Sequence, residues 1–258
     1  MINVVKIGGG IIEDESQLKL FLEAFSEIKG PKILVHGGGR MATTIGKKLG
    51  IESKMVDGRR VTDAATLELV TMVYGGLANK KIVAQLQAFG MNALGLTGAD
   101  GNVIRAHKRI NSKTDYGWVG DVDDVNVGLL TSLLDQNIVP VFAPLTHDGK
   151  GNMLNTNADT IASSVARAIA KAGQESQLVF GFELNGVLEN FSDKDSVIES
   201  ITAEKYSILK AGGIISDGMI PKLDNAFEAI NDGVTAVKIC HALQVNKAIL
   251  GNAGTVLQ

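Results

Sequence analysis

Short apolar runs alternate with longer amphipathic stretches along the whole chain, and this alternation restricts the fold more than any other feature. The runs predict strands at residues 4–7, 32–35, 93–96, 139–143, 178–182 and 236–239. The stretches predict helices at 14–28, from the second glycine triplet to about 49, 64–88, from 157 or 159 to about 172, and 217–230. Strands without polar alternation are buried on both faces. The pattern therefore predicts an α/β fold with a mainly parallel sheet between two helical layers.

Residues 102–121 interrupt this alternation. They are polar and rich in turn residues, and they end in Gly117-Trp118-Val119-Gly120-Asp121, which predicts a hairpin. A chain of 258 residues suits one large α/β domain or two lobes. Glycine-rich loops cluster at 8–10, 37–39 and 212–218, so we expect a lobe boundary between 150 and 175, at about residue 170.

Composition excludes several classes of function. With 25 basic and 28 acidic side chains the net charge is −3, which gives no basic footprint for nucleic acid. No apolar run approaches the ~20 residues of a membrane span. The single cysteine, Cys240, rules out an intrachain disulfide and fits a reducing cytoplasm. The histidines show no paired ligand spacing, so we expect no protein metal site; they are His36, His107, His147 and His241.

Two glycine triplets follow two of the predicted strands, at 8–10 and 37–39. Ligands of open parallel sheets collect beyond the carboxyl ends of the strands, and exposed backbone N–H groups can bind an anion there. Neither triplet matches the dinucleotide-binding fingerprint or the Walker loop. A tight strand-to-helix turn explains each triplet equally well, so anion binding and simple turn formation both stay open.

Two lysines stand in unusual positions. Lys6 interrupts an apolar strand directly before the first triplet, although an edge lysine reaching solvent would give the same pattern. Lys222 lies in the predicted first turn of a helix, where a cation opposes the helix dipole. A negative group should compensate it: Asp217, Asp224 or a bound anion. A solvated surface lysine is the alternative.

Polar residues precede two further predicted helices. In Asn155-Thr156-Asn157-Ala158-Asp159, Asn157 suits an N-cap and Asp159 the first turn, but Asn155 has no such explanation. Arg60 lies shortly before the helix that Thr62-Asp63 caps, where its guanidinium suits a carboxylate ligand. An ordinary surface ion pair explains Arg60 equally well.

Taken together, six motifs resemble those of the acetylglutamate kinases, members of the amino acid kinase superfamily. In chain order they are Lys6-Ile7-Gly8-Gly9, His36-Gly37-Gly38-Gly39, Gly58-Arg59-Arg60-Val61-Thr62, Ala78-Asn79-Lys80, Asn155-Thr156-Asn157-Ala158-Asp159 and Asp217-Gly218-Met219-Ile220-Pro221-Lys222. Each motif alone is a weak signal. Six in the same order, spread over essentially the whole chain, are specific.

The resemblance implies an αβα sandwich with a central, mainly parallel sheet. It implies one amino acid kinase domain over residues 1–258, with an acylglutamate-binding lobe at about 1–170 and a nucleotide-binding lobe at about 171–258. ATP, carrying Mg²⁺, would phosphorylate the side-chain carboxylate of an N-acyl-L-glutamate in arginine biosynthesis. That carboxylate is ionised at pH 7, which accounts for the lack of a general-base signature. The catalytic problem is then to bring an anion to a polyanion.

The resemblance also implies roles for single residues. Lys6 and Lys222 would stabilise the transferring phosphoryl group, and Asp159 would orient both lysines. The acylglutamate would be held by Gly38, Gly39, Arg60 and Asn155. The nucleotide would be bound by the backbone of Gly9, by Glu183, Asn185 and Gly186, and by Ile214, Ile215 and Ser216. The loop after the fifth strand departs from the aspartate-led family pattern, and only Gly186-Val187-Leu188 of it fits.

Several expectations concern assembly and specificity. Arginine-inhibited relatives carry an extra N-terminal helix that links dimers into hexamers. Because the first strand is predicted from about residue 2, we expect a cytoplasmic homodimer with little inhibition by arginine. N-acetyl-L-glutamate is the default acceptor and N-succinyl-L-glutamate the alternative, for which Arg59 and Lys80 are the available cations.

Two further classes of function stay open. One is another kinase of the superfamily, acting on carbamate, aspartate, glutamate or a nucleotide. The other is a non-catalytic sensor module on the same fold. Retention of Lys6, Asp159 and Lys222 together favours catalysis.

Overall fold

The computed structural model describes residues 1–56, 58–110, 113–215 and 219–258. Its centre is an eight-stranded sheet in the order β12-β14-β13-β11-β1-β2-β8-β5. All neighbouring strands pair in parallel except β13 and β14. The strands are β1 (Ile2–Ile7), β2 (Lys32–His36), β5 (Ala93–Leu96), β8 (Val139–Phe142), β11 (Ser176–Phe182), β12 (Ser200–Ile201), β13 (Ala236–His241) and β14 (Thr255–Leu257). The mainly parallel sheet is confirmed.

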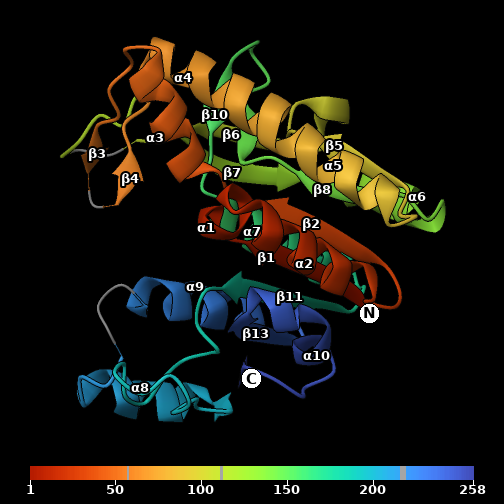
Figure 1. Ribbon diagram of the computed structural model, residues 1–258, viewed down its shortest axis with the longest axis vertical. Helices are drawn as coiled ribbons and strands as arrows, with labels where there is room; N and C mark the ends of the chain where they lie inside the picture. Colours follow the sequence, from red (N-terminus) through yellow and green to blue (C-terminus); the bar gives the residue numbers. More distant parts are fainter. Residues whose placement is uncertain (57, 111–112, 216–218) are drawn as a thin grey trace.

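Helices cover both faces of this sheet (Figure 1). One apolar cluster joins the sheet to α6 (Val127–Asp135), α7 (Ala158–Lys171), α8 (Ala203–Ala211) and α9 (Ile220–Asn231). The opposite cluster joins it to α1 (Gly9–Glu13), α2 (Glu15–Ser26), α5 (Asn79–Ala88) and α10 (Val245–Ile249). Apolar side chains thus fill both faces, as in the αβα sandwich that the resemblance implies.

Two smaller sheets accompany the main sheet and lie in the upper half of Figure 1. The first has the order β10-β9-β6-β7, from β6 (Ile104–Lys108), β7 (Gly120–Val125), β9 (Leu145–His147) and β10 (Met153–Asn155). Strands β6 and β7 form the antiparallel hairpin predicted at 102–121, although β7 continues to Val125. The second is the hairpin of β3 (Met55–Val56) and β4 (Arg59–Arg60).

The long helix predicted at 64–88 is continuous but changes its winding. It consists of α4 (Ala64–Val70), a π-helical segment η1 (Thr71–Ala78) and α5. A π-helix adds a residue to each turn and occurs mostly as short bulges, often at functional sites. The apolar pattern of the sequence does not reveal this change, because the buried stripe runs through all three segments.

Polar side chains cap the first turns of α7 and α2. Asn157 caps α7 by accepting the backbone N–H groups of Asp159 and Thr160 at 2.8 and 3.1 Å. Asp14 caps α2 in the same way, so this helix begins one residue later than predicted and ends at Ser26. Helix α3 spans Gly39–Lys48, and single 3₁₀ turns cover Asp100–Asn102 and Ala242–Gln244. The predicted helix start at Asp217 lies outside the described residues.

The sheet is continuous across the proposed lobe boundary, since β1 pairs with both β2 and β11. The division of the chain into two lobes at about residue 170 stays a prediction. In the described ranges, no helix is both long and apolar enough to cross a membrane.

Candidate active site

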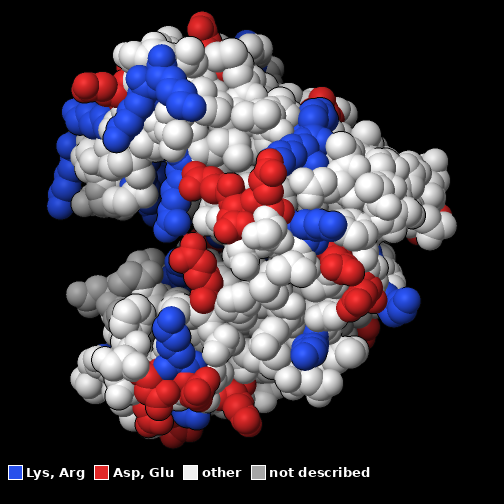
Figure 2. All heavy atoms as spheres, viewed as in Figure 1, with Lys and Arg blue, Asp and Glu red and all other residues white. Residues whose placement is uncertain are grey.

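Two cavities meet at the carboxyl ends of β1 and β2, where a parallel sheet places its ligands. Cavity A has a volume of about 230 Å³, and its lining includes Gly38, Arg60 and Asn155. Cavity B has a volume of about 430 Å³, and its lining includes Gly10, Glu183 and Lys222. Both cavities are lined by Lys6, Gly9 and Gly39. Figure 2 shows the molecule hollowed between the part that carries β3 and β4 and the part that carries α8.

Lys6 stands at this junction. Its side chain leaves β1 toward α7, and its Nζ atom lies 2.8 Å from Oδ1 of Asp159. The residue is only 7% exposed, so the ammonium is largely removed from solvent. Asp159 lies in the first turn of α7, where the helix dipole favours a carboxylate. The snorkelling alternative for Lys6 is therefore wrong, and the ammonium is held in place by the carboxylate.

Lys222 approaches the same point from the first turn of α9. Its Nζ atom lies 4.0 Å from the centroid of the Phe182 ring, and the Nζ atom of Lys6 lies 5.1 Å from that centroid. Burial lowers the pKa of Lys222, while Asp159 opposes the shift and Lys6 adds to it. Asp224 does not compensate Lys222, because it accepts from Tyr206 at 2.6 Å and from Lys210 at 3.1 Å. Asp217 lies outside the described residues. Of the three compensating groups that the sequence suggests for the charge of Lys222, this leaves a bound anion.

The two glycine loops pack directly against each other. Gly37 donates its N–H to the carbonyl of Ile7 at 3.0 Å, and a Cβ on Gly9 would lie 3.6 Å from the nitrogen of Gly38. Gly38 has φ 156°, and a Cβ there would meet the Tyr74 ring at 2.9 Å. Glycine is thus required at position 38 both by backbone conformation and by the neighbouring ring.

We expect Gly38→Ala to lower kcat/KM for the acceptor by about 10-fold or more, because the methyl group displaces either the loop or the Tyr74 ring. Gly76→Ala is the matched control, since nothing lies within 4 Å of its added Cβ. Steady-state kinetics of both variants test this. Equal activity of the two would show that the close approach at position 38 is without consequence.

Arg60 is buried beneath cavity A without an ionic partner in the described ranges. Its Nη2 donates to the carbonyl of Gly39 at 2.7 Å and to Oγ1 of Thr43 at 2.8 Å, and its Nη1 donates to Ser53. All three partners are neutral. A buried guanidinium with only neutral partners is costly and favours a carboxylate ligand.

Asn155 lies at the end of β10 and is tied to the segment that follows Arg60. Its Nδ2 donates to Oγ1 of Thr62 at 3.0 Å, and its backbone N–H donates to the carbonyl of Trp118 at 2.9 Å. These contacts place the side chain in the wall of cavity A. All four residues predicted to hold the acylglutamate thus line one cavity.

The predicted nucleotide residues are only partly brought together. Gly9, Glu183 and Gly186 line cavity B. Glu183 is exposed and lies 3.5 Å from Nη1 of Arg40. A smaller cavity of about 50 Å³ next to cavity B is lined by Gly186, Ile214 and Ile215.

Asn185 differs from this group, because it lines neither cavity A nor cavity B. Its Nδ2 instead donates to the carbonyl of Lys194 at 3.2 Å, within its own loop. Ser216 lies outside the described residues. The site roles of all these residues stay predictions.

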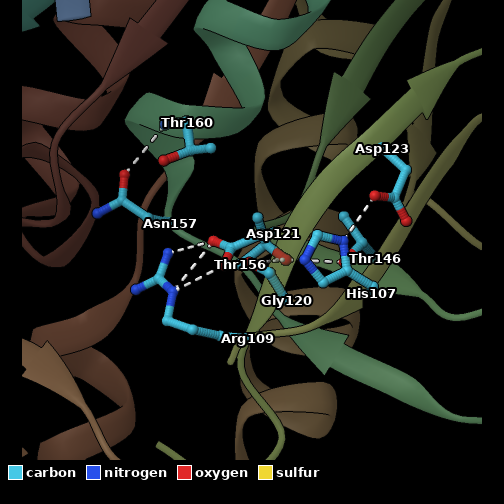
Figure 3. A network of polar contacts seen from close by, with 9 residues as sticks. All are labelled: His107, Arg109, Gly120, Asp121, Asp123, Thr146, Thr156, Asn157 and Thr160. Atoms are coloured by element: carbon cyan, nitrogen blue, oxygen red, sulfur yellow. Dashed lines mark hydrogen bonds and ion pairs between the residues drawn. The ribbon is translucent and has the colours of Figure 1, made fainter. Parts of the chain in front are cut away.

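The structure adds three residues that the sequence analysis misses. Phe182, the last residue of β11, places its ring close to both lysine ammonium groups, and the Tyr74 ring lies against Gly38. Arg109, directly after β6, lines cavity A and donates from Nε to both carboxylate oxygens of Asp121 at 3.0 Å. Figure 3 shows this pair beside Asn157. Lys80 does not line cavity A, since it donates to Asn79 and Gly95, whereas Arg59 does.

In the ranges that the structure describes, no group of three or more His, Cys, Asp and Glu side chains is arranged to hold a metal ion. Asp159, which lines cavity A, is already paired with Lys6.

Comparisons with known proteins agree with this arrangement. The sequence model of the amino acid kinase family matches residues 1–241. An acetylglutamate kinase of Phocaeicola vulgatus is 57% identical over 257 residues, covering 100% of this chain and 98% of the relative. An acetylglutamate kinase of Bacteroides thetaiotaomicron is 58% identical, covering 98% and 97%.

A solved structure, that of smu.665 from Streptococcus mutans, superposes with a TM-score of 0.78 at 29% identity. It covers 100% of this chain and 98% of its own. Sequence and structure therefore agree over nearly the full length. The chain belongs to the amino acid kinase family and, within that family, to the acetylglutamate kinases.

Proposed function

We propose that the protein transfers the γ-phosphoryl group of ATP to the side-chain carboxylate of an N-acyl-L-glutamate, with N-acetyl-L-glutamate as the acceptor. The observation that carries this proposal is the meeting of cavities A and B at Lys6. Cavity A offers Arg60 and the glycine amides to a small dianion. Cavity B offers Lys222 and Gly9 to the phosphates of a nucleotide.

The chemistry needs little beyond positioning and charge. The acceptor carboxylate is already ionised, so no side chain has to remove a proton from it. The two anions repel each other, and the transferring phosphoryl group spreads negative charge over its oxygens. Lys6 and Lys222 would meet that charge, and the N–H groups of Gly9, Gly38 and Gly39 would add fixed dipoles.

Asp159 would orient the two lysines and would not itself contact the substrate. Its carboxylate pairs with Lys6 and lies close enough to Lys222 to affect the pKa of that side chain. By holding both ammonium groups ready, it reduces the reorganisation needed when charge develops.

Mg²⁺ would arrive bound to the nucleotide, held by phosphate oxygens. This fits the donor set, since the described residues supply no cluster of protein ligands. The ion would neutralise part of the phosphate charge while Lys6 and Lys222 act on the transferred group.

A coupled ADP-release assay with a panel of acceptors tests this function. ATP-dependent turnover is expected with N-acetyl-L-glutamate and not with carbamate, aspartate or free glutamate. Free glutamate as the best substrate would exclude an acylglutamate kinase. No turnover with any acceptor would favour the sensor module.

The panel includes N-succinyl-L-glutamate, because cavity A also carries Arg59 and Arg109. The charge of Arg109 is already balanced by Asp121. Arg59 is exposed, and a second acyl carboxylate would have to be paired there. Turnover confined to the succinyl compound would make N-succinyl-L-glutamate the acceptor and would leave the assignment as a kinase unchanged.

We also propose a homodimer in the cytoplasm. Exposed apolar side chains support an interface: Met72 and Leu77 on η1, and Leu94 on the edge strand β5. Light scattering on the purified protein tests the assembly. A dimeric mass agrees with the proposal, and a monomeric or hexameric mass contradicts it.

A further inference from the structure

A buried chain of hydrogen bonds leads to the glycine loop Gly37–Gly39 without lining either cavity. It begins at Asn79, the first residue of α5, and passes through His36, the last residue of β2. The Nδ2 atom of Asn79 lies 3.2 Å from Nε2 of His36. The Nδ1 atom of His36 lies 2.7 Å from the carbonyl oxygen of Gly37. His36 is 0% and Asn79 1% exposed, so water does not compete for these contacts.

The other contacts of Asn79 decide where the imidazole proton sits. Its Nδ2 donates to the carbonyl of Val141 at 2.9 Å, and its Oδ1 accepts from Nζ of Lys80 at 3.2 Å. The amide can therefore face His36 only with an N–H group. Nε2 of His36 must accept that bond, so Nδ1 carries the proton and donates to Gly37. Burial lowers the pKa of His36 to about 4, which agrees with a neutral ring.

This bond fixes one peptide unit of the glycine loop. The carbonyl of Gly37 and the N–H of Gly38 belong to the same planar trans peptide and point in opposite directions. When the carbonyl is held at the imidazole, the N–H of Gly38 points away from it. The nitrogens of Gly38 and Gly39 lie on the side of Gly9, and neither donates a hydrogen bond within the described ranges. Both N–H groups are thus left for a ligand of cavity A.

The π-helical segment explains how one helix contacts this loop twice. The backbone N–H of Asn79 donates to the carbonyl of Tyr74, five residues earlier, as in a π-helix. The wider turn brings residues five apart toward one face, so the Tyr74 ring reaches Gly38 while the Asn79 amide reaches His36. Gly95 leaves room for that amide, since a Cβ there would lie 1.9 Å from Oδ1 of Asn79.

We propose that His36 and Asn79 are positioning residues for phosphoryl transfer, which hold the Gly37–Gly38 peptide so that the Gly38 N–H stays directed at the acceptor. The proposal rests on the proposed function. It gives a role to two residues of the motifs His36-Gly37-Gly38-Gly39 and Ala78-Asn79-Lys80 that line neither cavity A nor cavity B.

The decisive pair of variants is His36→Leu and His36→Asn. The leucine removes the donor, so kcat/KM for N-acetyl-L-glutamate should fall by about 10- to 100-fold, while KM for ATP stays near the wild-type value. The asparagine carries an N–H₂ group where Nδ1 stands in histidine, so it should restore most of the loss. Asn79→Leu should behave like His36→Leu.

The control is Gln177→Leu, which breaks a buried hydrogen bond to Asn3 at the far end of the same sheet. Loss of folded protein alone lowers the apparent kcat and leaves both KM values unchanged. A raised KM for the acceptor, in the His36 and Asn79 variants only, is therefore the specific sign of a displaced loop.

The nitrogen resonances of His36 give a readout independent of activity. Labelled wild-type protein should show the proton on Nδ1, and Asn79→Leu should disturb this state. A proton on Nε2 in the wild type, or wild-type kinetics of folded His36→Leu, would overturn the proposal. Wild-type protein inactive with every acylglutamate would instead refute the proposed function, with the resonance test still deciding the hydrogen-bond chain.

Discussion

Replacing Lys222 by Met is expected to lower kcat by about 10²-fold or more, equivalent to at least ~2.7 kcal/mol of transition-state stabilisation. The same loss is expected for Lys6→Met. Both ammonium groups lie within about 5 Å of the Phe182 ring, at 4.0 and 5.1 Å from its centroid. Each would meet charge that grows as the phosphoryl group leaves ATP. Methionine keeps most of the side-chain volume, so the fold should survive.

Lys210→Met is the matched control. Lys210 lies on α8 and pairs with Asp224, which lies on the same helix as Lys222, and Lys210 is more exposed than Lys222. Its kcat should match the wild type. Steady-state rates at saturating ATP and acceptor, with thermal melts to verify folding, provide the comparison. If Lys222→Met turned over as fast as Lys210→Met, Lys222 would be only a surface lysine.

Arg60→Met is expected to act on the acceptor and not on the nucleotide. The buried guanidinium has only neutral partners among the described residues, so an α-carboxylate would be its counter-ion. Removing one member of such a buried pair costs about 2–5 kcal/mol, which predicts a loss of about 30-fold or more in kcat/KM for the acceptor. KM for ATP should change little, because Arg60 does not line cavity B.

Arg167→Met serves as the control for Arg60. Arg167 forms a partly exposed ion pair with Asp232, and neither residue lines cavity A or cavity B. Its variant should keep both KM values. Titration of N-acetyl-L-glutamate at fixed ATP, repeated with the substrates exchanged, separates the two effects. If Arg60→Met raised only the KM for ATP, this arginine would not bind the acceptor.

The sequence predicts the six longer strands of the main sheet because each is an apolar run of at least four residues. Strands β12 and β14 have only two and three residues, too few to show a period. The π-helical segment is missed for another reason. Its buried residues continue the apolar stripe of α4 and α5, so the sequence pattern is that of an unbroken helix.

The candidate site is predicted where a residue contradicts its local pattern. Lys6 in an apolar strand and Lys222 at a helix start are conspicuous, and the structure brings both to Phe182. Tyr74 follows the apolar stripe of its helix, so its pattern in the sequence is that of a core residue, although it lines cavity A. Arg109 lies in the irregular connection between the hairpin strands β6 and β7, where no period marks which side chain turns inward.

The reaction product provides the most direct test of the central claim. A phosphorylated carboxylate is an acyl phosphate, which hydroxylamine converts to a stable hydroxamate. Wild-type protein with ATP and N-acetyl-L-glutamate should form hydroxamate in step with ADP release, and Lys222→Met should form very little. ADP release without hydroxamate from any N-acylglutamate, or more hydroxamate from free glutamate, would contradict an acylglutamate kinase.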